Sequence, residues 1–100
     1  MARLFYNKNK NDVVIFDLNE GSTSIGRNTE NDVVLSDKSV SKKHALITLQ
    51  GNSDAGVRVQ IADLHSTNGT YVNNRKVTYQ VLSDKDEIRI GKIELIFSIT

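Results

Sequence analysis

Apolar and polar side chains alternate along the segment Val57-Arg58-Val59-Gln60-Ile61-Ala62-Asp63. A period of two places the apolar side chains on one face of a β-strand and the polar ones on the other. Ile88-Arg89-Ile90 repeats the pattern over a shorter length. Strands with one wet face suit antiparallel sheets packed face to face, whereas parallel sheets need crossover helices. The two segments therefore predict an all-β protein.

The rest of the chain favours the same class. Val, Ile and Thr, whose branched Cβ suits a strand, make up 26 of the 100 residues. Pro is absent, so turns depend on 18 Asn and Asp residues and six Gly. Strands are expected at 2–6, 13–17, 23–26, 33–35, 44–49, 57–63, 70–72, 76–78, 87–90 and 93–100. No segment of ten or more residues has the apolar stripe of a helix.

Length and charge limit the possible functions. One hundred residues predict a single domain over 1–100 and exclude a two-domain enzyme. The longest apolar run, Val13 to Phe16, is far shorter than the roughly 20 residues of a membrane helix. A net charge of +1 gives no global attraction to nucleic acid or to a membrane surface. We therefore expect neither as a direct partner.

Three polar stretches, at 24–28, 38–44 and 65–70, contain the candidate binding groups. They hold an Arg that follows a Gly, a Ser-rich segment with three Lys, and a Ser/Thr/Asn turn. A guanidinium binds two phosphate oxygens at once, hydroxyls and amides donate to the others, and Lys adds charge without fixed geometry. The inventory therefore indicates phosphate recognition.

These motifs, in this order, resemble the forkhead-associated (FHA) domain. The resemblance rests on Gly26-Arg27, Asn31-Asp32, Ser41-Lys42-Lys43-His44 and Ser66-Thr67-Asn68-Gly69-Thr70, and it extends over residues 4–99. It implies a sandwich of two twisted antiparallel sheets with about eleven strands. It also implies a non-enzymatic module that binds phosphothreonine in an extended peptide. No cofactor or metal is implied.

Eight positions match the binding site of similar domains. They are the phosphate-binding Arg27, Ser41 and Lys42, the peptide-binding Thr67 and Asn68, and the site-shaping Gly26, His44 and Gly69. Asn68-Gly69 is also a common hairpin-turn pair, so the role of Asn68 in binding rests on the resemblance. Asn74 stands where the family often has Gly, and it tolerates the same left-handed conformation.

Simpler interpretations stay open for several of these residues. Arg27 would be an ordinary surface charge if it paired with Glu30 or Asp32, and His44 fits a structural hydrogen-bonding role better than a ligand role. Lys38 and Lys43 fit solvated charges as well as they fit help for an acidic ligand.

Catalytic and metal sites are disfavoured. Ser41, His44 and Asp37 have the residue types of a hydrolase triad, but nothing supplies an oxyanion hole. Two His and no Cys argue against zinc.

The resemblance also suggests a cellular context. Similar domains usually belong to longer proteins, so we expect this chain to be an N-terminal part of one. Several relatives with such a domain at their start are nuclear checkpoint adaptors in DNA-damage signalling. We therefore expect a nuclear location, with the cytoplasm as the alternative. The alternative function is a structural or dimerising sandwich with an unused pocket, since exposed edge strands support homodimers.

Overall fold

The computed structural model describes residues 2–9, 11–52 and 56–99, in which every regular element is a β-strand. The eleven strands are β1 (Ala2–Asn9), β2 (Asp12–Leu18), β3 (Gly21–Gly26), β4 (Val33–Val34), β5 (Ala45–Asn52), β6 (Gly56–Asp63), β7 (Thr70–Val72), β8 (Arg75–Val77), β9 (Tyr79–Val81), β10 (Glu87–Ile90) and β11 (Ile93–Ile99). The all-β prediction is confirmed. No helix that could span a membrane occurs in this described part.

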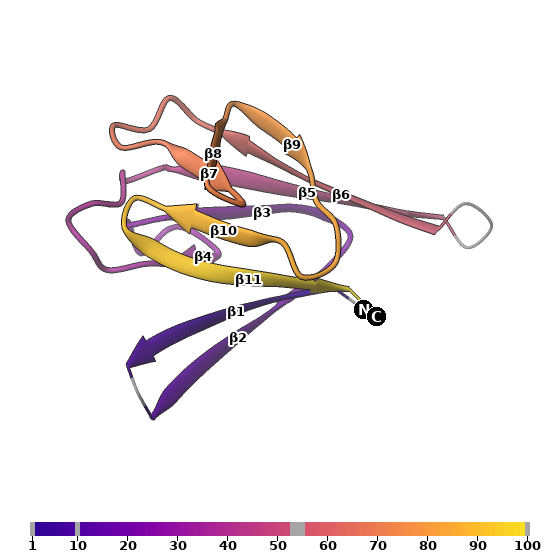
Figure 1. Cartoon of the computed structure of the whole chain (residues 1–100), viewed down its shortest axis with the longest axis horizontal. Helices are drawn as coiled ribbons and strands as arrows, with labels where there is room; N and C mark the ends of the chain where they lie inside the picture. Colours follow the sequence, from indigo (N-terminus) through magenta and orange to yellow (C-terminus); the bar gives the residue numbers. More distant parts are fainter. Residues whose placement is uncertain (1, 10, 53–55, 100) are drawn as a thin grey trace.

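The strands form two sheets (Figure 1). One has six strands in the order β2-β1-β11-β10-β7-β8, and the other has five in the order β4-β3-β5-β6-β9. Neighbouring strands are antiparallel except for β3 and β4, which pair in parallel through Ile25↔Val33 and Gly26↔Val34. The predicted sandwich of two antiparallel sheets is therefore confirmed, with this one parallel pair in the five-stranded sheet. A two-residue strand next to a long loop can pair in parallel without a crossover helix.

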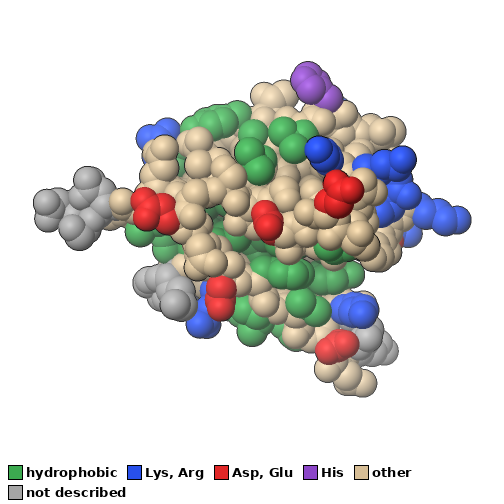
Figure 2. All heavy atoms as spheres, turned by 180° about the vertical axis from the view of Figure 1, so that it is seen from behind, with side chains coloured by type: hydrophobic (Ala, Val, Ile, Leu, Met, Phe, Trp, Pro, Cys, Tyr) green, Lys and Arg blue, Asp and Glu red, His purple; other side chains and the backbone are tan. Residues whose placement is uncertain are grey.

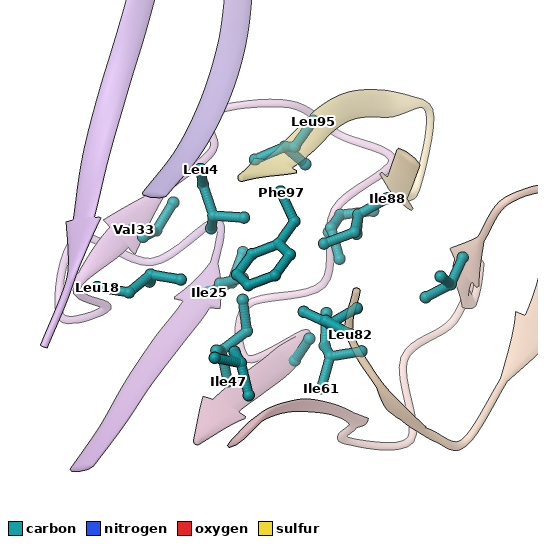
Figure 3. Close-up of a cluster of buried hydrophobic side chains, with 14 of the residues drawn as sticks. Leu4, Leu18, Ile25, Val33, Ile47, Ile61, Leu82, Ile88, Leu95 and Phe97 are labelled. Carbon is teal, nitrogen blue, oxygen red and sulfur yellow. The ribbon is translucent and has the colours of Figure 1, made fainter. Parts of the chain in front are cut away.

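The core lies between the sheets and follows the alternation seen in the sequence. On β6, Val59 and Ile61 are buried while Arg58 is exposed. Phe97 of β11 is fully buried, and Figure 3 shows its ring among side chains of both sheets, including Leu4 and Ile47. Burying alternate residues of each strand in this way supplies most of the stabilisation of a sandwich.

Ten of the eleven strands overlap a predicted segment, although residue 100, the end of the last one, lies outside the described residues. The missing strand is β9, whose three residues are all exposed and so leave no apolar alternation. Asn73 and Asn74 have φ of 50° and 67° and close the β7–β8 hairpin, as expected of residues that tolerate the left-handed region.

Asn68-Gly69 does not form the hairpin turn that its sequence suggests. The loop 64–69 joins β6 to β7, and these strands belong to different sheets. In Figure 1 this loop lies at the same end of the sandwich as the loops around β4. The first and last described strands meet at the opposite end, where Ala2 pairs with Ile99. The fold thus separates the loop end from the chain termini.

Candidate functional site

Three loops meet at the free end of the sandwich, at residues 27–32, 35–44 and 64–69. The Arg27 amide donates to the Ser41 carbonyl over 3.0 Å, which ties the first loop to the second. The Thr67 amide donates to the Ser41 hydroxyl oxygen, also over 3.0 Å, which ties the third loop to the second. Both contacts involve Ser41, so this residue is the common point of the three loops.

Arg27 is exposed, and its Nε donates to the Val40 carbonyl over 3.0 Å. This contact fixes the guanidinium while its two Nη groups have no bond to any described residue. The alternative pairing with Glu30 or Asp32 is wrong: neither forms an ion pair with Arg27, and the Asp32 carboxylate instead accepts from the Ser24 amide at 2.9 Å. The donors of Arg27 are therefore available to a ligand.

Ser41 is half-buried, and one hydrogen-bonding role of its hydroxyl group is already taken. Because the hydroxyl oxygen accepts from the Thr67 amide, the hydroxyl proton is left to donate elsewhere. The Ser41 amide donates to His44 Nδ1 over 3.0 Å. Ser41 thus presents one hydroxyl donor beside the Arg27 backbone.

His44 is fully buried and joins two of the loops. Its Nδ1 accepts from the Ser41 amide, so the ring proton is on Nε2, which donates to the Gly69 carbonyl over 2.8 Å. Both nitrogens are used by the backbone, so the ring is held as the neutral Nε2–H tautomer. The contacts do not form a hydrolytic triad, since His44 does not contact the Ser41 hydroxyl and Asp37 bonds to Ser39.

Gly26 allows two loops to pack closely. A Cβ at this position would lie 2.2 Å from the Lys42 carbonyl oxygen and 2.6 Å from Asn31 Nδ2. That Nδ2 donates to the Lys42 carbonyl over 2.7 Å and to the Asn28 carbonyl over 2.9 Å. The missing side chain of Gly26 therefore makes room for the backbone of Lys42.

Asn68 is exposed and is held by the second loop. Its Nδ2 donates to the Ser39 carbonyl over 2.9 Å. The Ser39 hydroxyl donates to Asp37 Oδ1 over 2.7 Å and accepts from the Lys92 amide over 2.9 Å. Gly91 allows this close packing, because a Cβ there would lie 2.4 Å from the Ser39 carbonyl oxygen. The Asn68 carboxamide is thus fixed, with Oδ1 free of bonds to described residues.

Asp63 organises the loop 64–69 and was not predicted as a site residue. Its carboxylate accepts from the Ser66 amide over 3.1 Å, from the Ser66 hydroxyl and from the Thr70 hydroxyl over 2.8 Å. Partial burial acts to raise the pKa of Asp63, but the hydrogen bonds from Ser66 and Thr70 outweigh it and hold that pKa below its usual value. A carboxylate three residues before a Ser is the sequence signal for such a turn.

The remaining predicted residues lie at the same end of the molecule. Lys42 and Thr67 are exposed, as are Lys38 and Lys43. Gly69 is buried and has φ of +87°. Figure 2 shows Lys and Arg side chains gathered at one end of the molecule. All eight predicted site residues thus lie in the loops, or at the strand ends next to them, at one end of the sandwich, and its cations form a local positive field that the net charge does not reveal.

A comparison with protein families supports this arrangement: the family model for the FHA domain matches residues 23–91. The chain belongs to the FHA domain family. It is 42% identical over 82 residues to the glycogen accumulation regulator GarA of Mycolicibacterium smegmatis, covering 82% of this chain and 49% of that protein. It is 40% identical to the oxoglutarate dehydrogenase inhibitor of Corynebacterium diphtheriae, covering 82% and 54% of the two chains.

Solved structures agree with the family assignment. One, from a structural and functional analysis of phosphothreonine-dependent FHA domain interactions, superposes with a TM-score of 0.85 at 35% identity. The match covers 99% of this chain and 96% of that one. The chain spans about half the length of the curated relatives it matches.

Replacing Gly26 by Ala is expected to destabilise the domain by about 1–3 kcal/mol, because the new Cβ forces the Lys42 carbonyl to move. The matched control is Gly51→Ala, since a Cβ there meets nothing within 4 Å. We expect the control to change the free energy of unfolding by less than about 1 kcal/mol. Urea denaturation measures both, and equal effects of the two substitutions would contradict the close packing at Gly26.

The lowered pKa of Asp63 predicts a specific pH dependence of stability. A carboxyl group whose pKa is lower in the folded state stabilises the fold above its unfolded pKa of about 3.9, and this contribution is lost as the pH falls through the folded value. The difference in unfolding free energy between the wild type and Asp63→Asn should therefore be constant between about pH 5 and 7 and shrink below about pH 4. A difference that stays constant down to about pH 2 would refute the stabilised carboxylate.

Proposed function

We propose that this domain binds a phosphothreonine-containing segment of a protein and acts by binding, not by catalysis. The observation that carries the proposal is the convergence on Ser41, which brings an unused hydroxyl donor next to the backbone of Arg27. The phosphothreonine-dependent interactions named for the similar solved structure support the same ligand. A phosphate of about −1.5 to −2 charges matches a guanidinium, a hydroxyl and a nearby ammonium.

Each group has a distinct role in this proposal. Arg27 and Ser41 donate to the phosphate oxygens, and Lys42 adds charge. Thr67 and Asn68 hold the peptide backbone, Asn68 through the carboxamide groups not used by Ser39. A charge-assisted hydrogen bond contributes about 1.5–3 kcal/mol, and micromolar binding needs only about 8 kcal/mol in total. The phosphate contacts are therefore large enough to make binding conditional on phosphorylation.

A preference for phosphothreonine over phosphoserine would depend on the one methyl group that distinguishes them. Its burial contributes at most about 0.8 kcal/mol, and more only if the pocket also fixes the rotamer. We therefore propose a preference for phosphothreonine and not absolute exclusion of phosphoserine.

The relatives do not support the DNA-damage context that the resemblance suggested. The named relatives are a bacterial regulator and a bacterial enzyme inhibitor, so they support regulation through a bound partner and give no support to a DNA-damage checkpoint role. The nuclear location and the place of the domain in a longer protein stay untested predictions. What we propose is a regulatory adaptor that recognises a kinase product.

The alternative function is a dimerising sandwich with an unused pocket. The edge strand β2 favours this alternative, because the apolar residues Val13 and Ile15 on it are 55% and 52% exposed. A strand edge with apolar side chains can pair with a second copy. This alternative predicts concentration-dependent dimers and the same affinity for phosphorylated and unmodified peptides.

A phosphothreonine peptide should bind at least about 100-fold more tightly than its unmodified copy. Because Arg27 donates to the phosphate, Arg27→Ala should weaken binding by about 10- to 100-fold. Calorimetric titration measures both affinities. Arg58→Ala is the control, since Arg58 is an exposed cation on β6 whose guanidinium donates to the Tyr79 hydroxyl and to none of the loop residues described above. Equal affinity for the two peptides would refute phosphothreonine-dependent binding.

A further inference from the structure

Lys76 lies over the peptide-binding loop, although it is 35 residues after Ser41 in the chain. Gly69 has no Cβ, and a Cβ built there would lie 3.0 Å from Lys76 Cε and 3.3 Å from Tyr71 Cε1. Lys76 and Tyr71 are cross-strand partners on β8 and β7. The aliphatic part of Lys76 and the Tyr71 ring therefore both pack against the backbone of Gly69, the residue after Asn68.

The Lys76 ammonium is available to a ligand. It forms no ion pair or hydrogen bond with the residues that the structure describes, and Lys76 is an exposed residue. The ring of Tyr71 already carries another cation, since Arg89 lies 4.1 Å from its centroid. The packing of the stem limits the freedom of the side chain, so less entropy is lost when the ammonium binds an anion.

No carboxylate of the described residues forms an ion pair with the Lys76 ammonium. Asp63 bonds to Ser66 and Thr70, Asp32 bonds to Ser24, and Asp37 bonds to Ser39 and lies 3.8 Å from the Lys92 ammonium. Besides Arg27, Lys38, Lys42 and Lys43, the loop end therefore offers an exposed cation at Lys76.

We propose that Lys76 is a specificity-determining residue that reads a second anionic side chain on the bound peptide, either a carboxylate or another phosphate. This inference rests on the proposed binding of phosphothreonine. The path from the Ser41 hydroxyl through Thr67 and Gly69 to the Lys76 ammonium is at most about 18 Å long. An extended peptide advances about 3.3 Å per residue, and the length of an acidic side chain adds several ångströms to its reach. The anionic residue therefore lies within about four residues of the phosphothreonine.

A positional scan tests this inference. The base peptide carries one phosphothreonine flanked by Ala and Ser, and eight derivatives carry a single Glu at each position from −4 to +4. A second series carries a second phosphothreonine in place of Glu, which distinguishes a carboxylate from a phosphate ligand. A third series carries Lys in place of Glu. Affinities are measured for the wild type, Lys76→Ala and Lys76→Glu, with Arg58→Ala as a control that removes the same charge from β6.

One position should raise the affinity of the wild type about 3- to 10-fold, and this gain should disappear in Lys76→Ala but persist in Arg58→Ala. Lys76→Glu should instead favour a Lys at that position, a reversal that a merely structural role of Lys76 would not produce. A gain that survives in Lys76→Ala, or the absence of any favoured position, overturns the inference while leaving the proposed function intact. A wild type that fails to bind the base peptide contradicts the proposed function itself.

Discussion

The hydrogen bond from the Thr67 amide to the Ser41 hydroxyl is the contact on which the site depends. It joins the loop that connects the two sheets to a loop within the five-stranded sheet, and it leaves the hydroxyl proton of Ser41 available to a ligand. The amide of Ser41 is used by His44, and its carbonyl by Arg27. One residue thus connects three loops and still offers a donor, which is the preorganisation that anion binding needs.

The sandwich supports this network by supplying rigid strand ends. Phe97 and the other core side chains fix the sheets, and the buried His44 ring then fixes the Gly69 carbonyl. Gly26 and Gly91 let backbone segments approach where a side chain would collide with Lys42 or Ser39. The binding groups therefore need few rearrangements, so little of the binding free energy is lost in ordering the site when a ligand binds.

Much of this arrangement could be predicted from the sequence, for physical reasons that differ between elements. Period-two alternation predicted β6 and its neighbours, whereas β9 has three exposed residues and gave no signal. The short pairing of β3 with β4 depends on a loop path that alternation does not encode. Asn68-Gly69 looked like a hairpin turn because the dipeptide reports local conformation and not which sheets it joins. The contacts of Ser39 with Asn68 and Lys92 are long-range and polar, so local patterns missed them. The turn from Asp63 to Ser66 is local, and its signal in the sequence was overlooked.

Resonances of the loop residues test the central claim most directly. In a two-dimensional ¹H–¹⁵N spectrum titrated with a phosphothreonine peptide, we expect saturable shifts of the Arg27 Nε–H and of the Ser41 and Thr67 amides. The unmodified peptide should leave these signals unchanged. Shifts confined to the β2 edge, or the same shifts with both peptides, would contradict a phosphate site built around Ser41.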